Sequence, residues 1–372
     1  MKRRETLSSV RRLVVKVGTN VLSSEQGVLD RKQISKLSKE ISELVKEGLE
    51  VVLVSSGAIT AGKADIGLKS RPKTIPEEQA AAAVGQGRLM HSYSECFGLG
   101  GLCVAQILLT QADLRDRRRY LNARNTILTL LRAGVIPIVN ENDTVAVDEL
   151  YFGDRFGDND TLSALVTNLI EAELLLILTD VDGLFSGKEL VDVVEKVSPS
   201  IESHVKEKKS GFGKGGMASK LRAVKIVTES GEKAVIANGR LSGVLRSVLR
   251  GDNVGTLFLP ASGKIAGRKR WIAFTLQTCG TLAVDAGAKR ALKEGKSLLP
   301  SGIDTVDGRF RIGDAVSIRD DKGEFARGLI NYSFDEVGKI IGAKSGEIES
   351  ILGYKSYDEV IHRDNLVVLE CL

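Results

Sequence analysis

Cysteine and histidine are scarce in this 372-residue chain. It has four cysteines and three histidines, and none of them is spaced as CxxC or HxxxH. Zinc sites and disulfide frameworks depend on such spacings, so neither is expected, and a reducing cytoplasm is the simplest compartment. A catalytic cysteine or histidine dyad would have to come from very few residues. We therefore expect chemistry based on lysine, carboxylates and backbone amides.

Long apolar runs are also missing. No apolar segment approaches the roughly 20 residues that a membrane-spanning helix needs. The basic opening segment MKRRETLSSVRR leads directly into LVVKVG, without the apolar core of a signal peptide. We expect no membrane partner. Because 42% of the residues are apolar, the composition excludes a disordered or collagen-like chain.

Short β-branched runs alternate with longer amphipathic stretches in the first two thirds of the chain. Runs that are apolar on both faces and joined by helix-length crossovers predict a mostly parallel sheet sandwiched by helices. The predicted strands cover residues 13–18, 51–54, 102–107, 135–139, 174–178 and 233–237. The predicted fold class is therefore α/β.

The residue pattern of the sequence changes after Gly255. The basic run KIAGRKR (264–270) and the only tryptophan, Trp271, precede short strands with frequent glycine turns. We predict a catalytic domain over 1–260, a linker over 261–276 and a small β-rich domain over 277–372. From residue 277 onward, 13 Lys and Arg face 16 Asp and Glu, so the positive net charge lies in the first domain and the linker.

Small and polar residues follow five of the predicted strands, and they are Gly18 to Asn20, Ser55 to Gly57, Asn140 to Asp143, Thr179 to Asp180, and Asn238 to Gly239. In an open parallel sheet, ligands bind beyond the carboxyl ends of the strands. Backbone N–H groups and helix N-termini at that edge favour anions. Loops are generally polar, which explains any one of these strand ends but poorly explains all five.

Two lysines stand out. Lys16 interrupts the apolar strand VVKVG, where an unpaired ammonium is costly, so it is expected to face a negative ligand or a carboxylate. The alternative is a strand-end lysine that reaches solvent. Lys220 follows the glycine-rich segment SGFGKGG and begins a predicted helix, although a flexible solvated loop would also be rich in glycine. Two lysines beside glycine turns suit phosphoryl transfer.

Carboxylates and amides concentrate in NENDTV (140–145) and GDND (157–160). A substrate with both a carboxylate and an ammonium group needs such paired donors and acceptors. The alternative is an Asx-turn and a helix N-cap. The basic segment LRDRRRYLNAR (114–124) is interpreted as the solvated face of a helix that buries Leu121 and Ile127, rather than as a nucleic-acid site.

Several segments together resemble the amino acid kinase family: VVKVGTNVL, VSSGAITAG, AAVGQGRLM, LNARNT, VIPIVNENDTV, FGDNDTLSALV, LLILTDVDGL and GKGGMASKL. The C-terminal segments LAVDAGAKRAL, SLLPSGI and GDAVSI resemble the PUA domain. The resemblance implies transfer of the ATP γ-phosphoryl group to the side-chain carboxylate of L-glutamate, the first step toward proline. It also implies Mg²⁺, feedback inhibition by proline, and a homo-oligomer. Acetylglutamate and aspartate kinases are the near alternatives.

The resemblance also implies roles for individual residues. Lys16 and Lys220 would stabilise the transferring phosphoryl group, and Asp160 would hold these lysines in place. Ser56, Asp143 and Asn159 would bind glutamate. The nucleotide would be bound by Lys16, Gly18, Gly57, Thr179, Asp180, Lys214, Gly215, Gly216, Met217, Ala218, Ser219 and Lys220. No metal ligand is assigned. An RNA-binding protein that acts through the PUA-like domain is the alternative function, although this domain is acidic.

Overall fold

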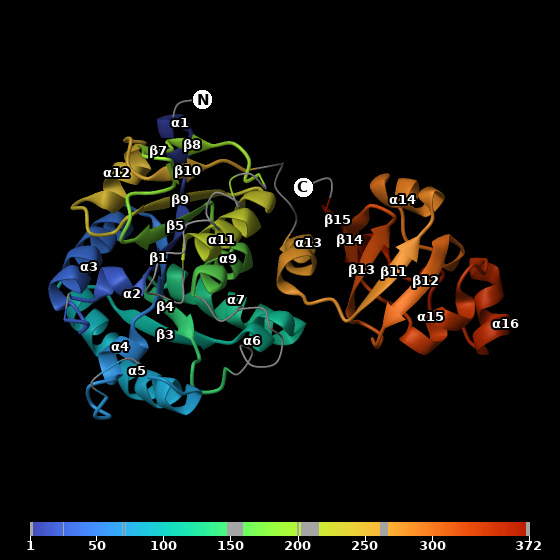
Figure 1. Cartoon of the computed structure of the whole chain (residues 1–372), viewed down its shortest axis with the longest axis horizontal. Coiled ribbons are helices and arrows are strands. Elements are labelled where there is room, and N and C mark those ends of the chain that lie inside the picture. Colours follow the sequence, from blue (N-terminus) through green and yellow to red (C-terminus); the bar gives the residue numbers. More distant parts are fainter. Residues whose placement is uncertain are drawn as a thin grey trace. The chain divides into compact units, whose positions relative to one another are not determined.

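The computed structural model describes residues 3–24, 26–68, 70, 72–146, 159–198, 201, 216–260 and 267–369. The chain divides into two compact units, Met1–Ala261 and Ser262–Leu372. In the described residues, the first unit is built on an eight-stranded sheet and the second on a five-stranded sheet (Figure 1). Within the same residues, no helix has the length and apolar character needed to cross a membrane.

All six strands predicted from the sequence are present in the first sheet: β1 Arg12–Val17, β2 Glu50–Ser55, β3 Val104–Leu109, β4 Ile136–Glu141, β5 Leu174–Thr179 and β9 Lys233–Asn238. They are parallel, in the order β3-β4-β2-β1-β5-β9. The predicted α/β fold with a mostly parallel sheet is confirmed. Two short strands were not predicted: β10 (Thr256–Phe258) is antiparallel to β9, and β8 (Val193–Val194) pairs with β10.

Helices cover both faces of this sheet. One face is covered by α3 (Arg31–Lys46), α5 (Ile75–Gly98) and α12 (Val244–Arg250), and the other by α7 (Arg117–Arg132), α9 (Asn159–Leu169) and α11 (Met217–Glu229) (Figure 1). Side chains of a strand alternate between the faces. In β1, Leu13, Val15 and Val17 join the core under α3, α5 and α12. Lys16 therefore lies on the opposite face, with α9 and α11.

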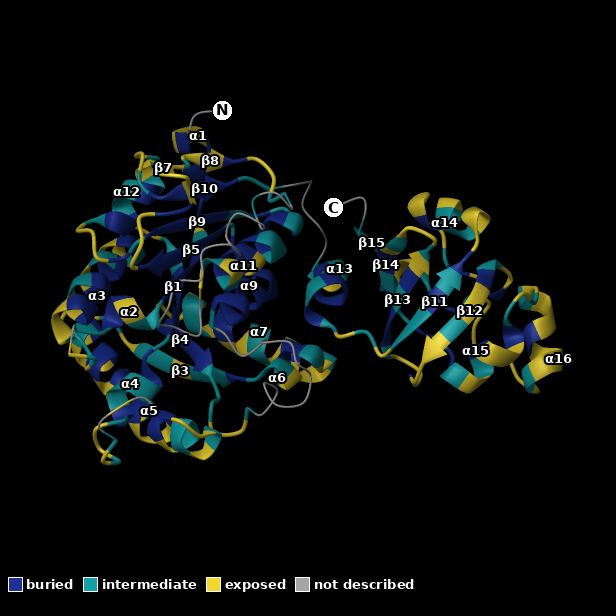
Figure 2. Cartoon of the chain, in the orientation of Figure 1, coloured by how far each residue is buried: buried dark blue, intermediate teal, exposed yellow. Residues whose placement is uncertain are grey.

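Local sequence explains why these helices form and where they dock. The carboxylate of Asp30 caps α3 by accepting hydrogen bonds from the backbone N–H groups of Lys32 and Gln33. Apolar residues then recur along α3 at helical spacing and are fully buried, at Ile34, Leu37 and Ile41. In α9 every residue from Asp160 to Leu169 is buried, which places the start of this helix inside the molecule (Figure 2).

A glycine contact brings α4 (Ala58–Gly62) unusually close to α5. A Cβ atom on Gly85 would lie 1.8 Å from the carbonyl oxygen of Ala58, and one on Gly62 would lie 2.1 Å from that of Ala81. No side chain fits at either position. Because α4 directly follows the end of β2, this contact fixes the loop that carries Ser56.

Replacing Gly85 with alanine is expected to lower the free energy of unfolding of the first unit by about 1–3 kcal/mol, because the two helices must separate. Gly87 provides a matched control on the same helix, since nothing lies within 4 Å of an added Cβ there. Gly87→Ala should raise helix stability by up to about 1 kcal/mol. Urea unfolding followed by circular dichroism measures both, and equal stability of the two variants would contradict the packing argument.

The C-terminal unit has a sheet in the order β12-β11-β13-β14-β15. Its strands are β11 Gly280–Val284, β12 Ile303–Gly308, β13 Ala315–Asp320, β14 Gly323–Leu329 and β15 Leu366–Val368. The helices α14 (Ala286–Lys293), α15 (Phe334–Ile340) and α16 (Ile348–Leu352) accompany them. Strand residues such as Leu282, Val316 and Phe325 form a separate apolar core. The predicted β-rich second domain is confirmed.

Part of the predicted linker is helical in the described residues. Residues Gly267–Arg270 form α13 and Trp271–Thr275 continue it as a π-helical turn. Trp271 and Ile272 are buried, and Arg327 of β14 donates a hydrogen bond to the carbonyl oxygen of Ala273 at 2.8 Å. The basic residues before Trp271 suggested a linker, but Trp271 and Ile272 pack against β14. Residues 267–275 therefore belong to the folded C-terminal unit.

The basic helix α7 also differs in one detail. Ile127 is fully buried as predicted, but Leu121 has an exposed fraction of 37%. The residue buried on the same face as Ile127, two turns before it, is Tyr120, the neighbour of Leu121, with an exposed fraction of 3%. The buried face of α7 therefore lies one residue away from the predicted one.

Candidate active site

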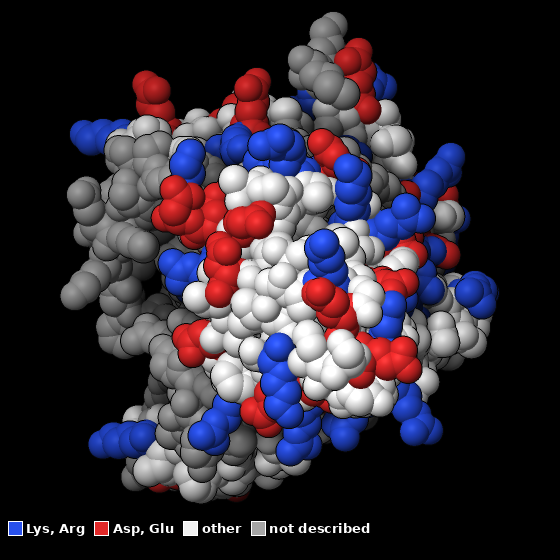
Figure 3. Space-filling model, turned by 90° about the vertical axis from the view of Figure 1, so that its right-hand side faces the viewer, with Lys and Arg blue, Asp and Glu red and all other residues white. Residues whose placement is uncertain are grey.

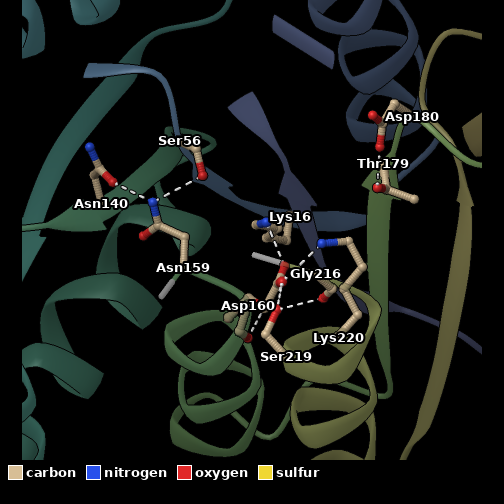
Figure 4. Close-up of polar contacts among 11 residues, drawn as sticks. Lys16, Ser56, Asn140, Asn159, Asp160, Thr179, Asp180, Gly216, Ser219 and Lys220 are labelled. Atoms are coloured by element: carbon tan, nitrogen blue, oxygen red, sulfur yellow. Dashed lines mark hydrogen bonds and ion pairs between the residues drawn. The ribbon is translucent and has the colours of Figure 1, made fainter. Parts of the chain in front are cut away.

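Two lysines meet one aspartate at the carboxyl edge of the first sheet. The Nζ atom of Lys16 on β1 lies 2.5 Å from Oδ1 of Asp160, and Nζ of Lys220 on α11 lies 3.1 Å from Oδ2 (Figure 4). The Asp160 side chain is fully buried, and only 6% and 7% of the two lysine side chains are exposed. Three residues that are distant in the sequence thus form one buried charged cluster.

The charge of Asp160 is set by these neighbours. Burial alone would raise the pKa of its carboxyl group, but attraction to Lys16 and Lys220, with hydrogen bonds from Lys16 and Ser219, holds the pKa at about 2. The group is therefore a carboxylate at neutral pH. Two ammonium groups against one carboxylate leave a net positive charge in a site largely removed from water.

The start of α11 is tied to this cluster. The hydroxyl oxygen of Ser219 lies 2.7 Å from Oδ2 of Asp160 and 2.9 Å from the carbonyl oxygen of Gly216. The first turns of α9 and α11 therefore lie side by side (Figure 4), and their N-terminal N–H groups favour an anion at this edge. Met217 and Ala218 lie in the same first turn of α11. Lys214 and Gly215 lie outside the described residues.

A group of neutral polar side chains lies beside the charged cluster. The amide nitrogen of Asn159 donates to the hydroxyl oxygen of Ser56 at 3.1 Å and to Oδ1 of Asn140 at 3.0 Å. The amide nitrogen of Asn140 donates to Oε1 of Gln86 on α5 at 2.9 Å. Asp143, the third residue expected to bind glutamate, lies in the turn that follows β4. The structure brings Ser56 and Asn159 together, and their role as ligands remains a prediction.

Thr179 and Asp180 end β5 on the other side of the lysines. The Thr179 hydroxyl donates to Oδ1 of Asp180 at 3.0 Å, and Asn20 donates to Oδ2 at 2.9 Å. Burial would raise the pKa of Asp180, but the hydrogen bonds from Asn20 and Thr179 lower it on balance. Asp180 is therefore a second carboxylate at this edge, separate from Asp160.

Two glycines keep the strand ends free of side chains. Gly57 has φ = +107° at the junction of β2 and α4, a conformation that residues with a Cβ rarely adopt. A Cβ on Gly18 would lie 3.7 Å from Nζ of Lys16 and would occupy space next to the charged cluster. A Cβ on Gly57 would instead face Leu22 and Leu29, so the role of both glycines in leaving room for a ligand remains a prediction.

The strand order arranges these groups in a row. Because the sheet runs β4-β2-β1-β5, Asn140, Ser56, Lys16 and Thr179 follow one another across its edge (Figure 4). The charged cluster of Lys16, Lys220 and Asp160 lies between the polar side chains around Asn159 and the Thr179–Asp180 pair. Among the described residues, no group of three or more His, Cys, Asp or Glu side chains is arranged to hold a metal ion.

The sequence placed Gln86 in the segment AAVGQGRLM but assigned it no role in the site. It lies in the middle of α5 between two glycines, and only its contact with Asn140 reveals its place in the site. Asn140 belongs to the segment NENDTV that was expected near the substrate, but no individual role was assigned to it. Asn20, which holds Asp180, was likewise only a strand-end residue.

Comparison with known proteins identifies both units. Residues 11–238 match the model of the amino acid kinase family, and residues 280–352 match the model of the PUA domain. A glutamate 5-kinase of Citrifermentans bemidjiense is 52% identical, with 99% of this chain and 100% of the relative covered. The chain belongs to the amino acid kinase family, among its glutamate 5-kinases.

A second relative is similarly close, whereas the solved structures match more distantly. A glutamate 5-kinase of Moorella thermoacetica is 50% identical, with 98% of each chain covered. Among solved structures, a carbamate kinase from Giardia lamblia matches with a TM-score of 0.47 at 20% identity, covering 68% of this chain and 99% of that one.

Proposed function

We propose that this enzyme transfers the γ-phosphoryl group of ATP to the side-chain carboxylate of L-glutamate, producing L-glutamyl 5-phosphate for proline biosynthesis in the cytoplasm. The observation that carries this proposal is the pairing of one buried carboxylate, Asp160, with Lys16 and Lys220. This cluster lies between the polar side chains around Asn159, which suit an amino acid, and the end of β5 at Thr179, which suits a nucleotide. The 52% identical relative is a glutamate 5-kinase over its full length.

The reaction needs positive charge more than it needs a base. The side-chain carboxyl group of glutamate has a pKa of about 4.3 and is already ionised at neutral pH, so no proton has to be removed. The obstacle is the approach of this anion to a negatively charged phosphoryl group. Lys16 and Lys220 would offset that charge as it spreads over the transferring oxygens. With a pKa of about 2, Asp160 does not take up a proton at neutral pH and instead orients the lysines.

The order of the polar groups along the sheet edge suggests where each of the two substrates would bind. Glutamate would bind on the side of Ser56, Asp143 and Asn159. The nucleotide would bind on the side of Thr179 and Asp180, and the resemblance implies that Lys214 to Lys220 bind it as well. Transfer would then occur at the lysines between them, where binding in a fixed geometry contributes to the rate.

We include Mg²⁺ in this proposal as part of the nucleotide. Mg²⁺ is usually held by substrate phosphates and water with one or two carboxylates, rather than by a cage of protein ligands. The described residues fit this mode, since they offer single carboxylates at the sheet edge and no larger cluster. When bound, the ion neutralises charge on the β- and γ-phosphates.

The proposal predicts that purified protein with Mg²⁺ and ATP releases ADP only when L-glutamate is added. A coupled ADP-release assay would compare L-glutamate with L-aspartate and N-acetyl-L-glutamate. Aspartate is one methylene shorter, and N-acetylglutamate lacks the ammonium group, so both should react poorly. Equal or higher turnover with either compound would contradict the proposed substrate.

Three further expectations remain predictions: a homo-oligomer, feedback inhibition by proline, and RNA as a partner of the PUA domain. The face drawn in Figure 3 shows basic and acidic side chains interspersed with uncharged ones. An RNA site is normally marked by clustered basic residues. The acidic balance of residues 277–372 points the same way, so RNA binding is the weaker of the two functional hypotheses.

A further inference from the structure

A backbone group fixes the direction of the Asn140 side-chain amide. The N–H group of Glu141 donates to one end of this amide at 2.9 Å. Because a backbone N–H can only donate, the atom that receives it must be the carbonyl oxygen, Oδ1. The other end is therefore the NH₂ group, which lies 2.9 Å from Oε1 of Gln86. Gln86 must act there as an acceptor.

The direction of Asn140 sets that of Asn159. Oδ1 of Asn140 also accepts a hydrogen bond from Asn159, so the contacting atom of Asn159 is its nitrogen. The second hydrogen of this nitrogen is donated to the Ser56 hydroxyl. The remaining atom, Oδ1 of Asn159, is buried and has no hydrogen-bond partner among the described residues. The chain of amides thus leaves a single buried acceptor in the region proposed for the amino acid.

The packing of α5 places Gln86, whose own amide nitrogen is buried without a hydrogen-bond partner among the described residues. It lies on α5 next to Gly85, where α5 touches α4 without room for a Cβ, and Leu89 behind it is fully buried. Two turns further along α5, the hydroxyl of Tyr93 lies 2.8 Å from that of Ser55, the neighbour of Ser56. The helix therefore supports the ends of both β4 and β2.

We infer that Gln86 is a positioning residue for the amino-acid substrate. By accepting from Asn140, it acts together with the Glu141 N–H group to hold the amide that leaves Oδ1 of Asn159 as an acceptor. The donor of matching chemistry is the α-ammonium group of the substrate. This inference rests on the proposed function. Without an acceptor at position 86, the NH₂ group of Asn140 is left unpaired and only the Glu141 N–H group still directs this amide, so Asn140, and Asn159 with it, are held less firmly.

The test compares Gln86→Leu, which removes the acceptor, with Gln86→Glu, which keeps an acceptor. In Gln86→Leu, KM for glutamate is expected to rise roughly ten- to hundredfold, because one buried polar group loses its partner, while kcat and KM for ATP change little. Gln86→Glu should restore most of the loss. Ser92→Ala is the matched control, since the Ser92 hydroxyl, 7% exposed, bonds only within α5, to the carbonyl oxygen of Arg88.

A second substrate separates positioning from a general structural effect. Glutarate has the same carboxylates as glutamate but no ammonium group, so its kcat/KM should be nearly the same in wild type and Gln86→Leu. The preference for glutamate over glutarate should therefore shrink in this variant. Thermal melting checks folding, and Gln86→Met, an unbranched residue of similar length, replaces Gln86→Leu if the latter does not fold.

The inference is overturned if Gln86→Leu or Gln86→Met has the wild-type KM for glutamate, or if activity on glutamate and glutarate falls equally. It is also overturned if Gln86→Glu is no better than Gln86→Leu, because the amide nitrogen would then be the important atom. An inactive wild-type protein would instead contradict the proposed function, so the two failures are distinguishable.

Discussion

Replacing Lys220 with alanine is expected to lower kcat by about a hundredfold to a thousandfold, the loss typical for one preorganised group that stabilises transition-state charge. Lys220 contacts Asp160 rather than the amide group near Ser56, so glutamate binding does not depend on it directly. KM for glutamate should therefore stay nearly constant. That combination marks an interaction made mainly in the transition state.

Two further variants make this result specific. Arg222 lies two residues further along α11 and is exposed, so Arg222→Ala removes a positive charge from the same helix without touching the buried cluster. It should retain near-normal kcat. Lys220→Arg keeps the charge but not the shape, and it should recover only part of the activity. A Lys220→Ala variant with near-normal kcat would show that the start of α11 has only a structural role.

The sheet and its functional edge could be predicted because their signals are local. Each of the six parallel strands is a short apolar run, and polar residues directly follow five of these runs, which is why the ends of β1, β2, β4 and β5 were found. Lys16 was recognisable because a charge interrupts a buried strand. Such features need only neighbouring residues in the sequence.

The remaining parts depend on contacts between distant residues. Gln86 looks like an ordinary helix residue until Asn140 is placed beside it. The strands β8 and β10 have two and three residues, too few for a periodic pattern, and they exist because they pair with each other and with β9. Trp271 is preceded by four basic or flexible residues, so only packing on the second unit shows that its segment is helical.

The Asp160→Asn variant is expected to lose both stability and activity. Asparagine has a similar shape, but it leaves the ammonium groups of Lys16 and Lys220 buried against a neutral amide. Breaking a buried ion pair in this way lowers the free energy of unfolding by about 3–5 kcal/mol. Activity should fall as well, because the lysines repel each other and leave their positions. Asp65→Asn is the control, since Asp65 pairs with Arg88, whose side chain is 60% exposed, and should cost about 1 kcal/mol or less.

The acid dependence of stability provides an independent test of the same pair. The pKa of Asp160 is about 2 in the folded protein, below the value of about 3.9 expected in the unfolded chain. A lowered pKa means that the charged carboxylate stabilises the fold above about pH 4, and that this contribution is lost as the pH falls toward 2. Wild type should therefore exceed Asp160→Asn in stability by a constant amount between pH 5 and pH 7, and the difference should shrink below about pH 4. Urea unfolding at pH 7, 5, 4 and 3 measures it. A difference that stays unchanged down to pH 3 would mean that the carboxylate does not carry its charge in the fold as the ion pairs with Lys16 and Lys220 require.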